Sequence, residues 1–350
     1  MDLEELFKIA IEKNASDIHF VPGYSPSVRI NGQLYVLKSY PVIDAEISQR
    51  TLLPILSDEQ KGNLMANKEI DFGLQHGDMR FRVNMYHMKG AIAAAFRLIT
   101  SQIRSLEDLA LPDIMQSFTK IRQGFVLITG PTGEGKSTSL AAIIQRINET
   151  DARHILTIED PIEYVYPVGR SLISQRELNQ DTHGWTVALK SALREDPDVV
   201  LVGEMRDYET IQAAMTIAET GHLVFSTLHT NSVPQTIDRI VDVFPPQQQN
   251  QIRIQLASSL QAVVSQRLLP NIDGTGRIAA CEILINNPAV AATIRDGKTH
   301  MIENILETST ESGMITMERA LSNLYAKGKI TKEVALNYAI RPQQIRKYIT

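Results

Sequence analysis

Short apolar runs separated by helical stretches dominate the chain from Gly124 onward. Each run is nearly continuous in apolar residues, which is typical of strands buried on both faces of a parallel sheet. The stretches between the runs predict helices, which carry the chain from one parallel strand to the next. This half therefore predicts an α/β domain, with strand candidates at 125–129 (FVLIT), 154–158 (HILTI), 199–203 (VVLVG) and 222–228 (HLVFSTL). After Pro246 the pattern becomes mostly helical, with one hairpin predicted around 271–285.

The first hundred residues follow a different pattern. An amphipathic helix is predicted to end near Asn14, because apolar residues recur on one helical face at Leu3, Leu6, Phe7, Ala10 and Ile11. A strand and two hairpins follow, one turning on Asn31-Gly32 and one on 75–78, and 91–99 suggests a further strand. We therefore expect a small α+β domain over 1–99, a linker over 100–112 and the α/β domain with its C-terminal helices over 113–350.

Composition limits the cellular setting and the class of ligand. The chain has 350 residues, a net charge of −5 and one cysteine, Cys281, which can form neither an internal disulfide nor a zinc site. No apolar stretch approaches the ~20 residues of a membrane-spanning helix, and the acidic amphipathic start does not resemble a signal peptide. These features predict a cytosolic protein, and the negative charge disfavours nucleic acid as its main ligand.

The stretch GPTGEGKS, directly after the predicted strand 125–129, fits the phosphate-binding pattern G-x-x-x-x-G-K-[ST]. Its backbone N–H groups and the following helix N-terminus suit the phosphates of ATP. Lys136 would neutralise the β- and γ-phosphate oxygens, and the Ser137 hydroxyl would ligate Mg²⁺. The predicted nucleotide-binding residues are Gly130, Pro131, Thr132, Gly133, Glu134, Gly135, Lys136, Ser137 and Thr138.

Acidic residues follow two of the other strands. Glu204 comes just after 199–202, while Gly203 occupies the position where a metal-binding aspartate is usual. Glu159 and Glu163, in the stretch TIEDPIEYVY, could contact Mg²⁺ through water, and Glu163 could equally be an exposed loop acid. We therefore expect Glu204 as the catalytic acid and Glu159, Glu163 and Glu204 near the metal.

Two histidines lie at the ends of the strand 222–228. His229 follows the end at which phosphates bind, so it could hydrogen-bond a γ-phosphate. His222 begins the strand and could either orient a neighbouring group or be purely structural.

These motifs, in this order, resemble the type IV pilus retraction ATPases, the PilT family of hexameric secretion-superfamily ATPases. The matching stretches are the phosphate loop, TIEDPIEYVY, DPDVVLVGEMRD, TGHLVFSTLHTN, the N-terminal ASDIHF and the C-terminal NPAVAATIRDGKTHMI. The resemblance implies a RecA-like ATPase domain preceded by a PAS-like domain, and it assigns the catalytic acid to Glu204. It also implies that Arg82 and Arg97 reach nucleotide phosphates, whereas Arg80 is expected to be surface charge.

One residue departs from the family pattern. Glu134 stands where a small residue is usual, and we expect its side chain to point to solvent with the loop backbone unchanged. The single cysteine also distinguishes the chain from pilus extension and type II secretion ATPases, which generally carry a tetracysteine zinc motif.

The resemblance implies an ATP-hydrolysing homohexamer that drives pilus retraction at the inner-membrane pilus platform, on the cytoplasmic side. The alternatives are an accessory retraction paralogue and a related secretion or DNA-uptake ATPase. A nucleotide-gated regulatory subunit fits the lysine, glutamate and histidine set less well.

Overall fold

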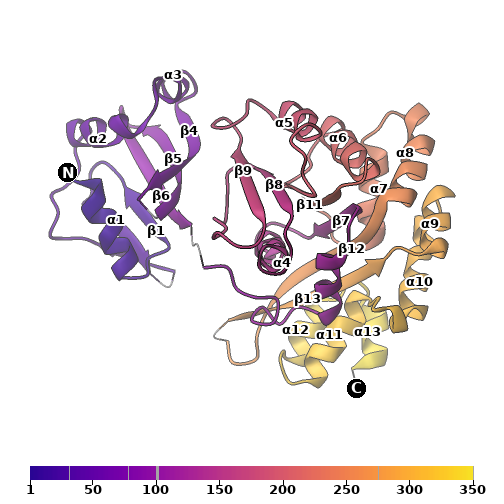
Figure 1. Ribbon diagram of the computed structural model, residues 1–350. Helices are drawn as coiled ribbons and strands as arrows, with labels where there is room; N and C mark the ends of the chain where they lie inside the picture. Colours follow the sequence, from indigo (N-terminus) through magenta and orange to yellow (C-terminus); the bar gives the residue numbers. More distant parts are fainter. Residues whose placement is uncertain (31, 78, 100–101, 275, 350) are drawn as a thin grey trace. The chain divides into compact units, whose positions relative to one another are not determined.

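The computed structural model describes residues 1–30, 32–77, 79–99, 102–274 and 276–349, and it forms two compact units (Figure 1). The first unit comprises residues 1–101 and 161–165, and the second comprises 102–160 and 166–350. Asn31, Asp78 and Thr275, which belong to predicted turns and hairpins, lie outside the described residues, as do the first two residues of the predicted linker.

The first unit is built on an antiparallel sheet with strand order β3-β2-β1-β6-β5-β4. Its helices pack their apolar residues on this sheet, and Phe7 of α1 stacks on Phe81 of β5 with ring centroids 4.2 Å apart. Asn14, just after α1, has a left-handed φ of 50°, which suits the predicted helix end. The elements are α1 (Leu3–Glu12), β1 (Asp17–Phe20), β2 (Ser27–Ile30), β3 (Gln33–Val36), α2 (Ala45–Leu52), η1 (Leu53–Ile55), α3 (Asp58–Asn67), β4 (Glu69–His76), β5 (Met79–Met88) and β6 (Ala91–Ile99).

The second unit contains a mixed, mainly parallel sheet with strand order β13-β12-β7-β11-β10-β8-β9. Every neighbouring pair is parallel except β12 and β13. The strands are β7 (Gly124–Thr129), β8 (His154–Glu159), β9 (Leu172–Glu177), β10 (Val199–Val202), β11 (Leu223–Leu228), β12 (Leu260–Pro270) and β13 (Arg277–Ile285). The α/β prediction is confirmed, and so is a hairpin among the helices after Pro246, formed by β12 and β13. The parallel pairing of β12 beside β7 was not predicted.

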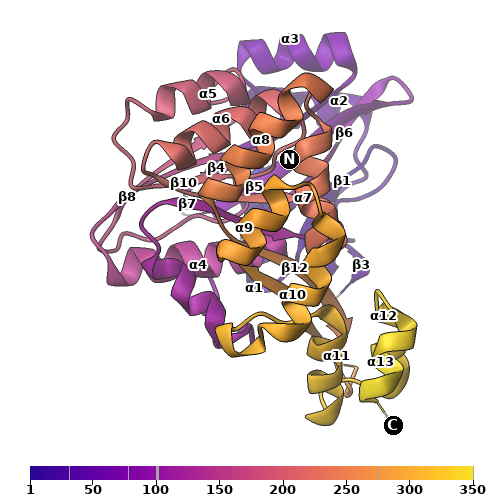
Figure 2. The same cartoon turned by 90° about the vertical axis from the view of Figure 1, so that its right-hand side faces the viewer.

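Helices cover both faces of this sheet, so alternate strand residues are buried on opposite sides. On one face η2 (Asp113–Lys120) and α4 (Lys136–Thr150) pack on residues such as Val126 and Phe225. On the other face helices pack on residues such as Leu127 and Val200 (Figures 1 and 2). The helices of that face are α5 (Trp185–Ala192), α6 (Tyr208–Glu219), α7 (Val233–Asp242), α8 (Pro246–Ser259), α9 (Pro288–Arg295) and α10 (Ile302–Thr308).

The C-terminal helices form a separate layer against the long β12–β13 hairpin (Figure 2). They bury their own apolar cluster together with Leu269 of β12 and Ala280 of β13. The helices are α11 (Met317–Ala326), α12 (Lys332–Tyr338) and α13 (Pro342–Tyr348), and short turns η3 (Thr299–Met301) and η4 (Thr310–Ser312) precede them.

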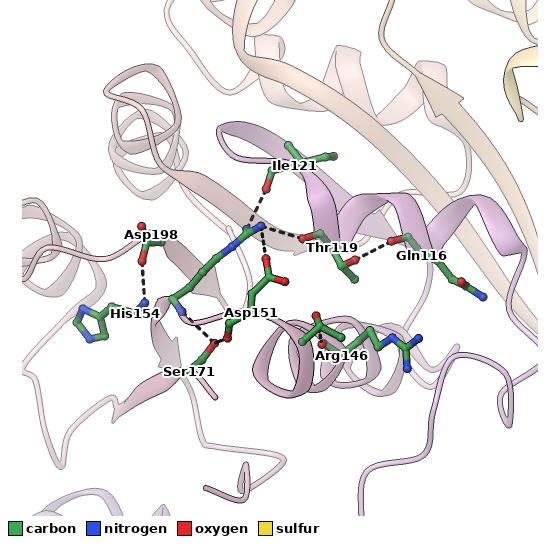
Figure 3. A network of polar contacts seen from close by, with 10 residues as sticks. Gln116, Thr119, Ile121, Arg146, Asp151, His154, Ser171 and Asp198 are labelled. Atoms are coloured by element: carbon green, nitrogen blue, oxygen red, sulfur yellow. Dashed lines mark hydrogen bonds and ion pairs between the residues drawn. The ribbon is translucent and has the colours of Figure 1, made fainter. Parts of the chain in front are cut away.

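The connector before β7 is fastened to the second unit. Leu106 and Leu111 are buried in the same apolar cluster as α4, although none of the residues 102–112 lies in a helix or strand. Arg153, only 5% exposed, donates to the carbonyl oxygens of Ile121 at 2.9 Å and Thr119 at 3.1 Å, just past and at the end of η2 (Figure 3). An ion pair of 2.7 Å with Asp151 balances its charge. The approach to β7 is therefore fixed.

In the described parts of the chain, no helix combines the length and the apolar character needed to cross a bilayer.

Candidate active site

The loop between β7 and α4 has the conformation that its glycines allow. Gly130, Gly133 and Gly135 have φ values of 148°, 84° and 77°, and Gly135 is the residue directly before α4. Residues with side chains rarely adopt such values. The 15-residue helix α4 then begins at Lys136, so its N-terminal N–H groups and partial positive charge lie at the loop. Lys136 is 8% exposed, and its side chain donates to the Pro131 carbonyl at 2.9 Å, across the loop.

Parallel pairing brings the predicted site segments to one edge of the sheet. Thr129 at the end of β7 pairs with Leu228 at the end of β11, and Val202 at the end of β10 pairs with Ser226 of β11. Val202 also pairs with Ile158, one residue before Glu159 at the end of β8. The phosphate loop, His229, Glu204 and Glu159 therefore all follow or end strands at the same carboxyl edge, where ligands bind in open α/β sheets.

Glu204 and His229 form a direct pair at this edge. His229 Nε2 lies 3.1 Å from Glu204 Oε2, and the Arg206 guanidinium pairs with the other carboxylate oxygen. The Glu204 side chain is 18% exposed, whereas those of His229 and Arg206 are 47% and 72% exposed. Partial burial raises the pKa of Glu204, but hydrogen bonds and charge from Arg206 and His229 outweigh it and hold that pKa below its usual value. The carboxylate is therefore ionised at neutral pH and can accept a hydrogen bond from water.

The other predicted acids are placed differently. Glu159 is 8% exposed and accepts hydrogen bonds from Thr157 at 2.7 Å and Gln175 at 3.3 Å. Glu163 is exposed and lies in the segment 161–165, which groups with the first unit. Within the described residues, no group of three or more His, Cys, Asp or Glu side chains could hold a metal ion.

Arg82 and Arg97 face each other across β5 and β6 in the first unit. They are directly paired in the strand register, where two positive charges would repel each other. Each has an acidic partner: Arg82 Nη2 lies 2.5 Å from Asp71, and Arg97 Nε lies 2.9 Å from Asp17. Their side chains remain 42% and 69% exposed. The charge of each arginine is thus compensated by a carboxylate, while both side chains stay exposed to solvent.

His222 contacts neighbouring residues of its own loop and of α6. It directly precedes β11, at the sheet edge opposite the phosphate loop, and its Nδ1 lies 3.0 Å from the Ile217 carbonyl and 3.2 Å from the Thr220 hydroxyl. These contacts join the end of α6 to the start of β11 and leave His222 outside the site.

The family model for type II/IV secretion system proteins matches residues 1–344. The chain belongs to this family. It is 43% identical to the type IV pilus retraction ATPase PilT of Pseudomonas aeruginosa, over 98% of this chain and 99% of that protein. It is 49% identical to a twitching motility protein of Neisseria gonorrhoeae, over 89% of this chain and 83% of that protein.

Within the family, the chain is a member of the PilT group. Its structure resembles the crystal structure of the pilus retraction motor PilT with bound ADP, with a TM-score of 0.92, 43% identity and 99% of each chain covered. The resemblance read from the motifs and the predicted fold class are therefore confirmed.

One expectation about this PilT-group chain is wrong. The Glu134 side chain points not to solvent but to β12, where its carboxylate accepts a hydrogen bond from the Leu268 N–H and pairs with Arg267 at 3.7 Å. It is only 16% exposed. β12 extends past the end of β7, so within the described residues the Leu268 N–H has no strand partner on that side and donates to the Glu134 carboxylate instead. The glycine pattern of the loop does not reveal this partner, because it lies far away in the sequence.

The residues on β12 that contact the phosphate loop were missed by the sequence reasoning. Gln266 is 1% exposed, donates to the Glu134 carbonyl at 2.6 Å and accepts from the Ser139 hydroxyl at 2.8 Å. Its signal in the sequence is the polar pair Ser265-Gln266, which together with Arg267 interrupts an apolar run. Polar residues within a buried strand need partners, so such a pair indicates a polar neighbour.

Proposed function

We propose that the chain is an ATP-hydrolysing motor that drives type IV pilus retraction. One observation carries the proposal: a glycine-rich phosphate loop and a Glu204–His229 pair share one sheet edge in a member of the PilT group. The relatives named as a pilus retraction ATPase and a twitching motility protein support the choice of retraction as the work performed. A PilT structure with bound ADP supports nucleotide binding.

The nucleotide phosphates would bind along 130–138. Backbone N–H groups of the loop and of the α4 N-terminus would surround them, and Lys136 would turn from the Pro131 carbonyl to the β- and γ-phosphate oxygens. The Ser137 hydroxyl would hold Mg²⁺, with Glu159 and Glu163 as candidates for contacts through water. Bound Mg²⁺ would supply charge neutralisation at the phosphates.

Glu204 would orient and deprotonate the water that attacks the γ-phosphate. Its two partners keep it ionised and fix its direction. His229 is half-exposed beside it and would hydrogen-bond the γ-phosphate, so that loss of the phosphate changes its bonding. Arg82 and Arg97 would act as the further cations that phosphoryl transfer needs, exchanging their carboxylate partners for phosphate oxygens.

We further propose that six copies form the working ring. The ring would act at the cytoplasmic face of the inner membrane, against the pilus platform, and would remove pilin subunits as ATP is hydrolysed. No nucleic acid is needed for this work, and the net charge of −5 agrees with that choice.

The proposal is tested with the wild type and Lys136→Ala, measured for phosphate release in vitro and for surface spreading and pilus number in cells. The wild type should release phosphate from ATP and restore spreading to cells that lack the gene. Lys136→Ala should do neither and should leave the cells hyperpiliated. Spreading restored by Lys136→Ala, or cells made bald by loss of the gene, would contradict a retraction motor.

A further inference from the structure

β12 runs past the end of its parallel neighbour β7 and so borders the phosphate loop. The last paired residues are Ser265 of β12 and Thr129 of β7. Beyond this point β12 pairs, among the described strands, only with β13, through Gln266–Pro270. The edge of β12 that faced β7 now lies beside the phosphate loop. The approach is close, because a Cβ built on Gly130 would lie 2.5 Å from the Gln266 carbonyl oxygen. A strand edge of this kind offers backbone groups that need partners.

Glu134 supplies the partner that a strand would otherwise provide. Its Oε2 accepts the Leu268 N–H, and its Oε1 lies 3.7 Å from Arg267 Nη1. Both side chains are largely withdrawn from water, with exposed fractions of 16% for Glu134 and 19% for Arg267. Hydrogen bonds to an ionised acceptor are stronger than neutral ones, so this contact holds the loop against β12.

The same hairpin holds the loop backbone. Gln266 Nε2 donates to the Glu134 carbonyl at 2.6 Å, and Arg277 Nη1 donates to the Gly133 carbonyl at 3.4 Å. In a trans peptide the C=O of one residue and the N–H of the next point in opposite directions. Because the two carbonyls face the hairpin, the N–H groups of Glu134 and Gly135 face away from it, toward the side on which phosphates would bind.

We infer that Glu134 is a positioning residue for nucleotide binding: its bonds to β12 hold the phosphate loop in its phosphate-accepting conformation, and Arg267 compensates its charge. The inference rests on the proposed function, because it requires that the loop binds nucleotide. A loop that is already held loses less freedom on binding. The compensation matters because an unpaired carboxylate in this loop would repel the triphosphate.

The first test compares the affinity of full-length variants for ADP by calorimetric titration, with Glu307→Ser, an exposed change on α10, as the matched control. Glu134→Ser removes the loop's bond to Leu268 and should raise Kd about tenfold or more, as expected for loss of a charge-assisted hydrogen bond. Glu134→Gln keeps an amide oxygen for that N–H and should raise Kd less. In steady-state hydrolysis the effect of Glu134→Ser should fall on KM more than on kcat. Tighter binding by both variants would show that the carboxylate only repels phosphate and would overturn the inference.

The second test concerns Arg267. Arg267→Gln leaves the Glu134 carboxylate uncompensated and should weaken ADP binding more than Glu134→Gln does, most clearly at low salt. The double variant Glu134→Gln with Arg267→Gln should recover affinity relative to Arg267→Gln alone. Absence of that recovery would overturn the compensation.

The outcomes also separate this inference from the proposed function. A wild type that binds no ADP would overturn both, whereas wild-type binding together with an unchanged Kd for Glu134→Ser would overturn only the positioning role. Thermal unfolding of each nucleotide-free variant checks that it is folded. A variant with a lowered melting temperature is assayed well below that temperature, so that loss of affinity is measured on folded protein.

Discussion

Replacement of Glu204 by glutamine isolates the chemical step of hydrolysis. The amide has nearly the same volume, and its oxygen can still accept one of the hydrogen bonds that now come from His229 at 3.1 Å and from Arg206. The negative charge and the proton-accepting capacity are lost. Losing a positioned general base costs ~10²–10⁴-fold in rate, and each factor of ten corresponds to about 1.4 kcal/mol of activation free energy. We therefore expect kcat to fall by about 10²-fold or more, which is at least about 2.7 kcal/mol.

Nucleotide binding should survive this change, because Lys136 and the loop glycines are untouched. The assay pairs single-turnover ATP hydrolysis with an equilibrium titration of ADP, and Glu209→Gln, an exposed change on α6, serves as the matched control. Lys136→Ala should show the opposite pattern and lose tight binding. Near-normal turnover by Glu204→Gln would refute the assignment and move the role of base to another acid, with Glu163 as the first to test.

Three further results are expected. Arg97→Lys should reduce turnover sharply, because an ammonium cannot replace the planar guanidinium fork, while Arg80→Ala stays near wild type; equal and mild effects in steady-state rates would mean that both are surface charge. Arg206→Gln should move the acid limb of the kcat–pH profile to higher pH, because Arg206 helps hold the pKa of Glu204 low and Glu204 must be ionised to act. An acid limb at the same pH as in the wild type would exclude this coupling. Gly130→Ala should weaken ADP binding by about tenfold or more, because its φ of 148° and the β12 carbonyl 2.5 Å away leave no room for a Cβ; unchanged affinity in a titration would show that the loop adapts.

The fold could be predicted where burial alone determines the pattern. The runs that became β7, β8, β10 and β11 are apolar on both faces, and that property is local. β12 was not predicted to join this sheet, because its mixed sequence LQAVVSQRLLP follows a helix directly and reads equally well as helix or strand. Its partner β7 lies more than a hundred residues earlier in the chain, and only the pairing decides the outcome.

The residues of the candidate site also differ in whether the local sequence reveals them. Glu204 could be found because an apolar strand ends next to it, and His229 for the same reason. The direct opposition of Arg82 and Arg97 could not, because it depends on the register of two strands. The contact of Glu134 with Leu268 spans 134 positions of sequence and could not be predicted either. Motifs therefore indicated candidate residues for the chemistry, whereas the partners of Glu134 emerged only from tertiary contacts.

A buried carboxylate on β13 makes a further long-range contact, with a residue close in sequence to His229. Glu282 is fully buried and accepts the N–H of Val233 at 2.8 Å and that of Met317 at 3.4 Å, the first residues of α7 and α11. Burial raises the pKa of Glu282, and these two N–H groups oppose that rise. Leaving a buried N–H without an acceptor costs about 1–3 kcal/mol, so the carboxylate stabilises both helix starts. Because α7 begins four residues after His229, one side chain fixes both the end of the segment that carries His229 and the start of the C-terminal helices. The loop that carries His229 and the first C-terminal helix are therefore joined through one buried side chain, and a change at Glu282 should disturb the starts of both α7 and α11.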